Sequence, residues 1–122
     1  MWRDSLIPQT LFENCPSETT LFYQPLLSSW YIVIANTFLS DSVGILTAPT
    51  ITGPWTQTMI PLYTISSDLL QGSFCYAGKS HPELAKNSSE IIFSFVCNTP
   101  TIPELINRTD VYVPRLIRTV IT

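Results

Sequence analysis

His81 is the only histidine in the chain and stands in the motif His81-Pro82-Glu83, which places an imidazole two residues from a carboxylate. Pro82 has a fixed φ and restricts the backbone of the preceding residue, so it would point the imidazole in a defined direction. Such a pair can bind a sugar hydroxyl, a water or an ion, or it can do no more than satisfy local backbone groups. We expect His81 and Glu83 to bind substrate. We expect no metal site, because one histidine cannot supply two imidazole ligands and the cysteine spacing matches no metal site. We also expect no cofactor.

Arg115 is the third candidate for the site, and it follows Tyr112-Val113-Pro114 inside a predicted strand. A guanidinium presents a planar fork of donors that suits carboxylates and other acceptor-rich groups. Arg115 could pair with a carboxylate such as Glu83 for structural reasons, or it could help to hold an anionic or polyol ligand.

Catalysis by paired carboxylates has weak support in the sequence. Glycoside hydrolysis needs two acids that face each other at about 5–10 Å. Most acidic residues here fall in turns or at strand ends, and Glu18, Asp68 and Glu83 are the only ones near the starts of predicted inner strands. Nothing in the sequence pairs them, and there is neither a Gly-x-Ser-x-Gly motif nor a phosphate-binding glycine loop. The catalytic residues are therefore unassigned, and the sequence leaves open whether the chain is an enzyme.

Composition excludes several classes of protein. The chain has 122 residues, of which 45% are hydrophobic and 12% charged, and this is too apolar for a disordered protein. The net charge is −3 and the six basic residues are scattered, so we expect no nucleic-acid partner. No apolar stretch approaches the length of a membrane span, and residues 1–9 show no signal peptide.

Three cysteines leave one thiol unpaired in any intramolecular arrangement, and their spacing matches no metal site. Cys75 and Cys97 lie in apolar strand contexts, which favour buried small side chains, although a bridge between them is possible. Two acceptor sequons, at Asn87 and Asn107, lie in polar loop-like segments and point toward a secreted parent protein.

The hydrophobic pattern predicts an all-β fold. Residues 20–23, 30–35, 43–47 and 57–62 are expected to form four short antiparallel strands, and residues 74–77, 90–98 and 112–121 continue the pattern. The run 30–35 is almost continuously apolar, as expected when both faces of a strand are covered. No segment shows the periodicity of a long helix. We predict a lead-in segment at 1–17, followed by a partial β-propeller domain at 18–122 with four-stranded blades at about 18–65 and 70–122.

The run Gly44 to Trp55, with its Ala-Pro and Gly-Pro-Trp turns, resembles a blade of the five-bladed propellers of arabinanase-like glycoside hydrolases. The segments 76–84, 92–98 and 112–115 look like the last blade of a more specific relative, a family of propeller domains of unknown function with some members linked to arabinan cleavage. This resemblance covers about Glu18 to the C-terminus. It implies that His81 and Glu83 face the propeller axis with Arg115 in support, and that earlier blades, absent here, supply most catalytic carboxylates.

Three hypotheses follow. The chain is part of a larger glycoside-hydrolase-like ring that binds or hydrolyses an arabinan-type glycan. Alternatively, several copies assemble as a homo-oligomer that completes the ring, or the chain is a non-catalytic carbohydrate-binding or structural β-module. In the first two cases, the missing blades or the other copies are partners of the chain. We expect the parent protein to be extracellular.

Overall fold

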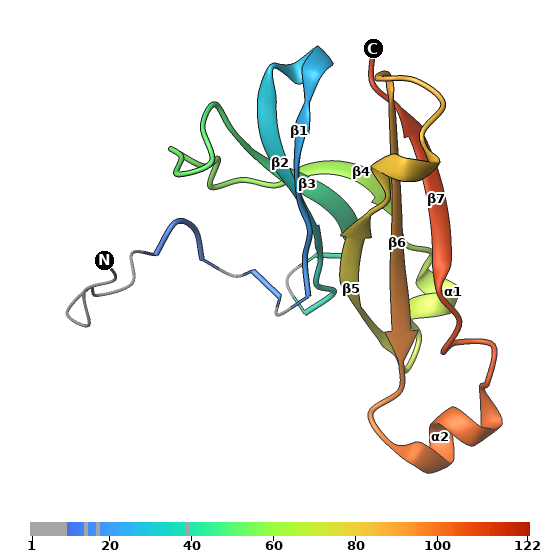
Figure 1. The fold of residues 1–122 in the computed structure, drawn as a ribbon. Coiled ribbons are helices and arrows are strands. Elements are labelled where there is room, and N and C mark those ends of the chain that lie inside the picture. Colours follow the sequence, from blue (N-terminus) through green and yellow to red (C-terminus); the bar gives the residue numbers. More distant parts are fainter. Residues whose placement is uncertain (1–9, 14, 17, 39) are drawn as a thin grey trace, which may run out of the picture.

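The computed structural model describes residues 10–13, 15–16, 18–38 and 40–122. These residues form two antiparallel sheets that pack against each other, joined and flanked by short helices (Figure 1). The mostly β character predicted from the sequence is therefore confirmed, and no helix in the described part exceeds six residues.

Each sheet is a simple meander in which strands that follow one another in sequence are paired. Sheet A contains β1 (Leu21–Gln24), β2 (Ser29–Ala35), β3 (Ser42–Ala48) and β4 (Ile60–Thr64), and sheet B contains β5 (Phe74–Ser80), β6 (Glu90–Asn98) and β7 (Arg115–Val120). The helical turns are η1 (Pro25–Leu27), α1 (Ser67–Leu70), η2 (Pro82–Leu84) and α2 (Ile102–Asn107). Within the described residues, sheet B has three strands where four were predicted.

Two strands begin later than the sequence pattern suggested. β4 starts at Ile60 and β7 starts at Arg115. Before β7, the chain forms turns in which Val111 accepts a bond from the amide of Val113. Pro114 has no amide hydrogen to donate to a ladder, which is consistent with a strand that begins directly after it.

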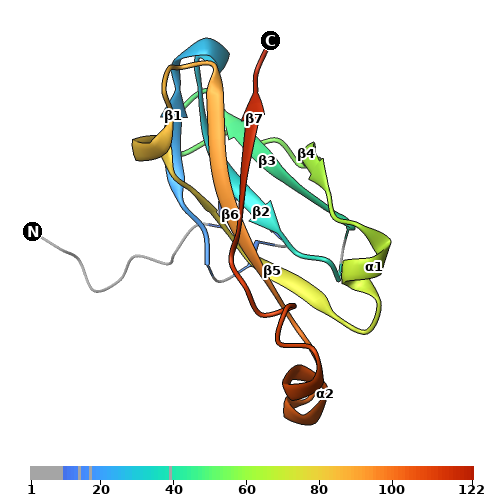
Figure 2. The ribbon, with the colours of Figure 1, turned by 90° about the vertical axis from the view of Figure 1, so that its right-hand side faces the viewer.

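The main core lies between the two sheets, and Figure 2 looks onto sheet B with sheet A behind it. Its members are buried side chains of β2, β3, β5 and β6, together with Ile65 and Val111. A second apolar cluster covers the opposite face of sheet A, where Phe12 and Cys15 pack against side chains of β2 and β3 and against Trp55. Both faces of β2 are therefore covered, which explains the continuous apolar run in its sequence.

Most of the large apolar side chains of β2 and β6 are buried, as is the tryptophan of the Gly-Pro-Trp turn. Ile32, Ile34, Trp55, Ile92, Phe93 and Phe95 are buried. Trp30 is only half-buried, because it lies near the start of β2 and its ring meets the exposed Tyr23 at a centroid distance of 5.7 Å.

Sheets A and B come closest where β5 passes β2. A Cβ atom added to Gly78 would lie 2.8 Å from the amide nitrogen of Ala35 and 3.1 Å from a methyl group of Val33. The register of β5 against β6 shifts between Tyr76 and Lys79, and Ala77 in this bulge has a positive φ of 57°. The bulge and the missing side chain of Gly78 together allow the close approach.

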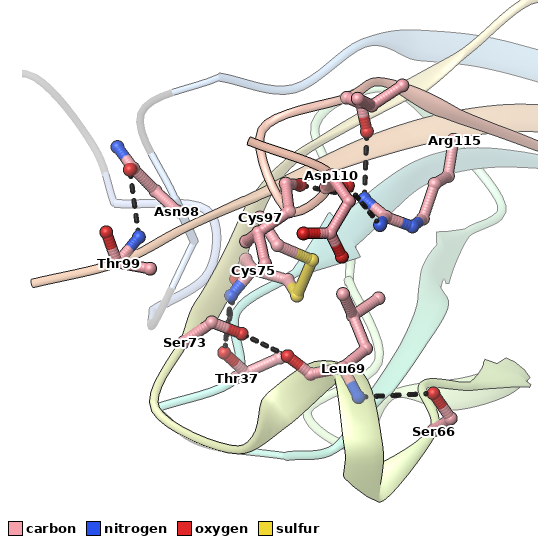
Figure 3. The surroundings of a disulfide bond; sticks show 12 residues. Thr37, Ser66, Leu69, Ser73, Cys75, Cys97, Asn98, Thr99, Asp110 and Arg115 are labelled. Atoms are coloured by element: carbon pink, nitrogen blue, oxygen red, sulfur yellow. Dashed lines mark hydrogen bonds between the residues drawn. A yellow bond between two sulfur atoms is a disulfide. The ribbon is translucent and has the colours of Figure 1, made fainter. Parts of the chain in front are cut away.

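Cys75 and Cys97 are direct cross-strand partners in sheet B and form a fully buried disulfide (Figure 3). The backbone amide of Cys75 donates to Oγ1 of Thr37, and the amide of Thr37 donates to the carbonyl of Cys75. The bridge thus lies where β5 is also bonded to the segment after β2. The sequence had left this pairing open, and Cys15 remains a free thiol.

The lead-in predicted at 1–17 falls partly outside the described residues, since positions 1–9, 14 and 17 are not included. The described positions 10–13 and 15–16 contain neither strand nor helix. In this segment the ring of Phe12 lies edge-on to Trp55 at 5.2 Å, so it contributes to the cover of sheet A. Among the helices of the described part, none is long and apolar enough to cross a membrane.

Candidate functional site

His81 lies at the junction of β5 and η2 on sheet B. Its backbone amide donates to the carbonyl of Ile92 at 2.7 Å, which continues the β5–β6 ladder by one residue. Pro82 then begins η2, as expected for a proline in the first turn of a helix. The side chain of His81 is 28% exposed. The motif is therefore held by the end of a strand ladder and still reaches solvent.

The imidazole of His81 connects two polar side chains. Nδ1 lies 3.2 Å from Oε1 of Glu83, and Nε2 lies 2.7 Å from Oγ of Ser94. A carboxylate can only accept, so Nδ1 carries the proton that points to Glu83. In the neutral ring Nε2 is then an acceptor, and the hydroxyl of Ser94 donates to it. The oxygens of Ser94 and Glu83 keep further lone pairs that a ligand could use.

The residues across the sheet from Ser94 complete this surface. Ser94 is the direct partner of Lys79 on β5 and of Leu116 on β7, so the three side chains share the face of sheet B that points away from sheet A. Lys79 is exposed, Glu83 is 64% exposed and Leu116 is 58% exposed. We call Lys79, His81, Glu83, Ser94 and Leu116 the His81 face. It combines an ammonium, an imidazole, a carboxylate, a hydroxyl and an apolar side chain.

A buried hydrogen bond lies behind this face. The hydroxyl of Tyr31 on β2 lies 2.5 Å from Oγ of Ser80, and Ser80 in turn lies 3.5 Å from the carbonyl oxygen of Ile92. Burial raises the pKa of Tyr31, the hydrogen bond with Ser80 lowers it, and the charge of Glu83 raises it further.

Arg115 makes no hydrogen bond or ion pair with His81 or Glu83 within the described part of the chain. Its guanidinium donates to the carbonyl oxygens of Val111 and Val113, both at 2.9 Å, and to that of Asp110 at 3.0 Å. Figure 3 shows the side chain turned toward this loop. Arg115 therefore holds the turns that precede β7 by binding their backbone carbonyls, and the pair with Glu83 that the sequence suggested does not form among the described residues.

The acidic residues considered for catalysis are distributed over different elements. Glu83 is bound to His81, whereas Asp68 lies in α1. Glu18 precedes β1 in the chain. Burial raises the pKa of Tyr76 on β5, a hydrogen bond with Asn98 lowers it, and Tyr112 and the charge of Glu18 raise it. Within the described ranges, no group of three or more His, Cys, Asp or Glu side chains could hold a metal ion.

The structure also contains two hollows that the sequence did not indicate. One has a volume of about 280 Å³ and lies against the outer face of sheet A, where Glu13, Asn36 and Gln57 surround apolar side chains such as Leu46. The other lies beside α1 and includes Asp68. Neither is lined by His81, Glu83 or Arg115. Trp55 is 5% exposed and packs on sheet A, so it offers no open ring on which a sugar could stack.

Ser94 is the residue of the candidate site that sequence reasoning missed. A signal was present, since it is the one hydroxyl side chain in the apolar run Ile91–Cys97. Its relation to His81 depends on the register of β5 and β6, and the bulge in β5 shifts that register. Comparison of the chain with protein-family models, curated proteins and solved structures finds no match.

Proposed function

We propose that the chain is a carbohydrate-binding unit formed by two blade-like sheets of a glycoside-hydrolase-like β-propeller, and that it binds an arabinan-type glycan. The observation that carries the proposal is the hydrogen-bonded series Glu83–His81–Ser94 on an exposed face of sheet B. Sugar hydroxyls both donate and accept, so they suit a surface that offers an ammonium donor beside carboxylate and hydroxyl acceptors. Leu116 adds an apolar surface for the C–H groups of a sugar ring.

The proposed role of this face is binding rather than bond cleavage. A second carboxylate opposite Glu83 would be needed for acid–base hydrolysis, and the described contacts of Glu83 include none. In the proposal, further blades of the parent ring or other copies of the chain supply that group. The buried Cys75–Cys97 disulfide supports an extracellular parent protein, because such bridges persist in oxidising compartments.

The single histidine makes this proposal directly testable by NMR, since its ring resonances have no overlap with other histidines. We expect arabino-oligosaccharides to shift the His81 ring signals in a saturable way. His81→Ala should weaken binding about tenfold, which corresponds to ~1.4 kcal/mol. Lys86→Ala is the matched control, because Lys86 is exposed on the same connection outside the His81 face.

Folding of each variant is checked by circular dichroism and by the retention of the disulfide. A folded wild-type chain whose His81 signals do not respond to any arabinan-type oligosaccharide contradicts the proposal. Release of reducing sugar from arabinan by the chain alone would instead show that the chain carries its own catalytic pair.

A further inference from the structure

The turn between η2 and β6 carries an Asn-x-Ser sequon, Asn87-Ser88-Ser89, that the carbohydrate-binding proposal does not use. Asn87 and Ser88 are exposed. Oδ1 of Asn87 accepts a hydrogen bond from the amide of Ser89 at 2.9 Å and from the hydroxyl of Ser89 at 2.5 Å. The side-chain amide nitrogen of Asn87 has no hydrogen-bond partner among the described residues.

From this geometry we infer that Asn87 is a site of N-linked glycosylation. Two donors on Oδ1 stabilise the negative charge that develops on this oxygen when the amide nitrogen gives up a proton. The nitrogen becomes the nucleophile toward the anomeric carbon of an oligosaccharide carried on a lipid diphosphate. A carbon–nitrogen bond forms, the bond from the anomeric carbon to the diphosphate oxygen breaks, and the lipid diphosphate leaves with the electron pair. The amide proton passes to a base of the transferase.

The contacts of Asn87 with Ser89 are local, so they do not require the chain to be folded before it is glycosylated. They join residues two positions apart, so the turn can form in an incompletely folded chain that a transferase can still reach. In the folded protein the same turn is anchored from both sides: the amide of Glu90 donates to the carbonyl of Asn87, and the amide of Ile121 donates to that of Ser89. Asn87 thus stays on the outside of a fixed turn, with room for a glycan.

The position of Asn87 in the fold leaves its glycan clear of the sheet interface. Figure 1 shows the connection between η2 and β6 at the end of sheet B where the C-terminus lies, and α2 at the opposite end. The buried Cys75–Cys97 bridge is an independent observation in favour, because oxidising secretory compartments both form such bonds and contain the transferase. The inference does not depend on glycan binding by the His81 face.

Asn107 provides the internal comparison. It is the last residue of α2 and is exposed, and it heads the sequon Asn107-Arg108-Thr109. No hydrogen bond links Asn107 to Thr109 in the part of the chain that the structure describes. Arg108 is instead tied to the carbonyl oxygen of Gln71. The inference therefore concerns Asn87 alone. Every protein in the test carries Asn107→Gln, so that the second sequon cannot be modified.

The test uses the full chain with Asn107→Gln, preceded by a cleavable secretion leader and produced in eukaryotic cells. Total cell lysate and medium are both analysed, so that a variant that folds poorly is still scored. The samples are treated with a glycan-releasing amidase in heavy-oxygen water, and the peptide with residue 87 is measured by mass spectrometry. The amidase converts a glycosylated asparagine to an aspartate that carries one heavy oxygen atom. We therefore expect labelled aspartate at position 87, and we expect the protein to lose the mass of one glycan.

Matched variants separate the acceptor from its surroundings. Asn87→Gln and Ser89→Ala should abolish the label, whereas Ser89→Thr, which keeps the hydroxyl, and Ser88→Ala should retain it. Cleavage of the leader shows that each protein entered the secretory compartment. The inference is overturned if leader-cleaved protein that retains Ser89 contains unmodified Asn87. It is also overturned if position 87 is fully labelled in the Ser89→Ala variant.

Discussion

At the scale of single residues, the chemistry of this chain depends on short chains of hydrogen bonds that cross from one strand to another. Glu83–His81–Ser94 lies on the outer face of sheet B, and Tyr31–Ser80 lies between the sheets. Because β5 alternates its side chains, Ser80 and His81 point to opposite faces of the same sheet. A polar group therefore lies on each face of the sheet at the end of β5: Ser80 is buried, and His81 is partly exposed to solvent.

Tyr31→Phe tests the buried group through the pH dependence of stability. The pKa of Tyr31 is raised in the fold by burial, so the unfolded chain loses this proton at lower pH than the native state does. The contribution of Tyr31 is thus complete below about pH 10, the ordinary pKa of tyrosine, and is lost as the pH rises toward the folded-state value. We expect Tyr31→Phe to lower the free energy of unfolding by about 0.5–1.5 kcal/mol at pH 8 and by less near pH 10.5.

Urea denaturation at the two pH values measures this difference. Tyr76 also has a raised pKa, so some alkaline loss should remain in the variant. Tyr23→Phe is the control, because that side chain is 49% exposed. The free energy of unfolding of this variant should change with pH as that of the wild type does. An equal penalty for Tyr31→Phe at both pH values would show that Tyr31 does not titrate differently on folding.

At the scale of elements, β5 joins the two sheets and carries the irregularities that make this possible. Its bulge contains Ala77 at positive φ, and Gly78 faces the backbone of β2. Its partner β6 carries Cys97, which fixes the register of the pair through the bridge to Cys75. The position of His81 at the end of β5 follows from these features.

Two adjacent substitutions in the bulge should have opposite effects. Gly78→Ala adds a Cβ at 2.8 Å from the amide nitrogen of Ala35, which belongs to a backbone that cannot give way cheaply. We expect a loss of about 1–3 kcal/mol in the free energy of unfolding. Ala77→Gly removes a Cβ from a left-handed conformation and should be neutral or stabilise by up to ~1 kcal/mol. Denaturant titration of both variants measures the effects, and a Gly78→Ala protein as stable as the wild type would contradict the close approach.

Removal of the disulfide should also lower the free energy of unfolding. The bridge closes a loop with a sequence separation of 22 residues, and the loss of such a link from a small domain costs about 2–5 kcal/mol. We expect this loss for the double variant Cys75→Ala/Cys97→Ala, measured by urea denaturation. Cys15→Ala removes a free thiol and is the control, with an expected change below about 1 kcal/mol. Equal stability of the double variant and the wild type would mean that the bond does not form in solution.

At the scale of the whole molecule, sheet B ends in a strand with one unpaired edge. β7 pairs only with β6 among the described strands, and it exposes Leu116 and Val120, each 58% accessible. An uncovered strand edge with apolar side chains favours pairing with another chain. This is the feature that most directly connects the fold with the hypotheses of a larger ring or a homo-oligomer.

We therefore expect the isolated chain to associate as its concentration rises, measured by size-exclusion chromatography with light scattering. Leu116→Lys/Val120→Lys should keep the chain monomeric at concentrations at which the wild type associates. Thr122→Lys, beyond the end of β7, is the charge control and should associate as the wild type does. A wild-type chain that remains monomeric at high concentration would show that this edge needs no cover.

The sequence by itself determined the local features of the protein. Alternating and continuous apolar runs located the strands to within a few residues, because these signals depend on neighbouring residues alone. The continuous run of β2 correctly indicated that both of its faces are covered. The tertiary structure decided which strands lie in register, and with it the Cys75–Cys97 pairing and the contact of Ser94 with His81. A bulge of one or two residues moves every later pair along the ladder, so such contacts cannot be read from spacing along the chain.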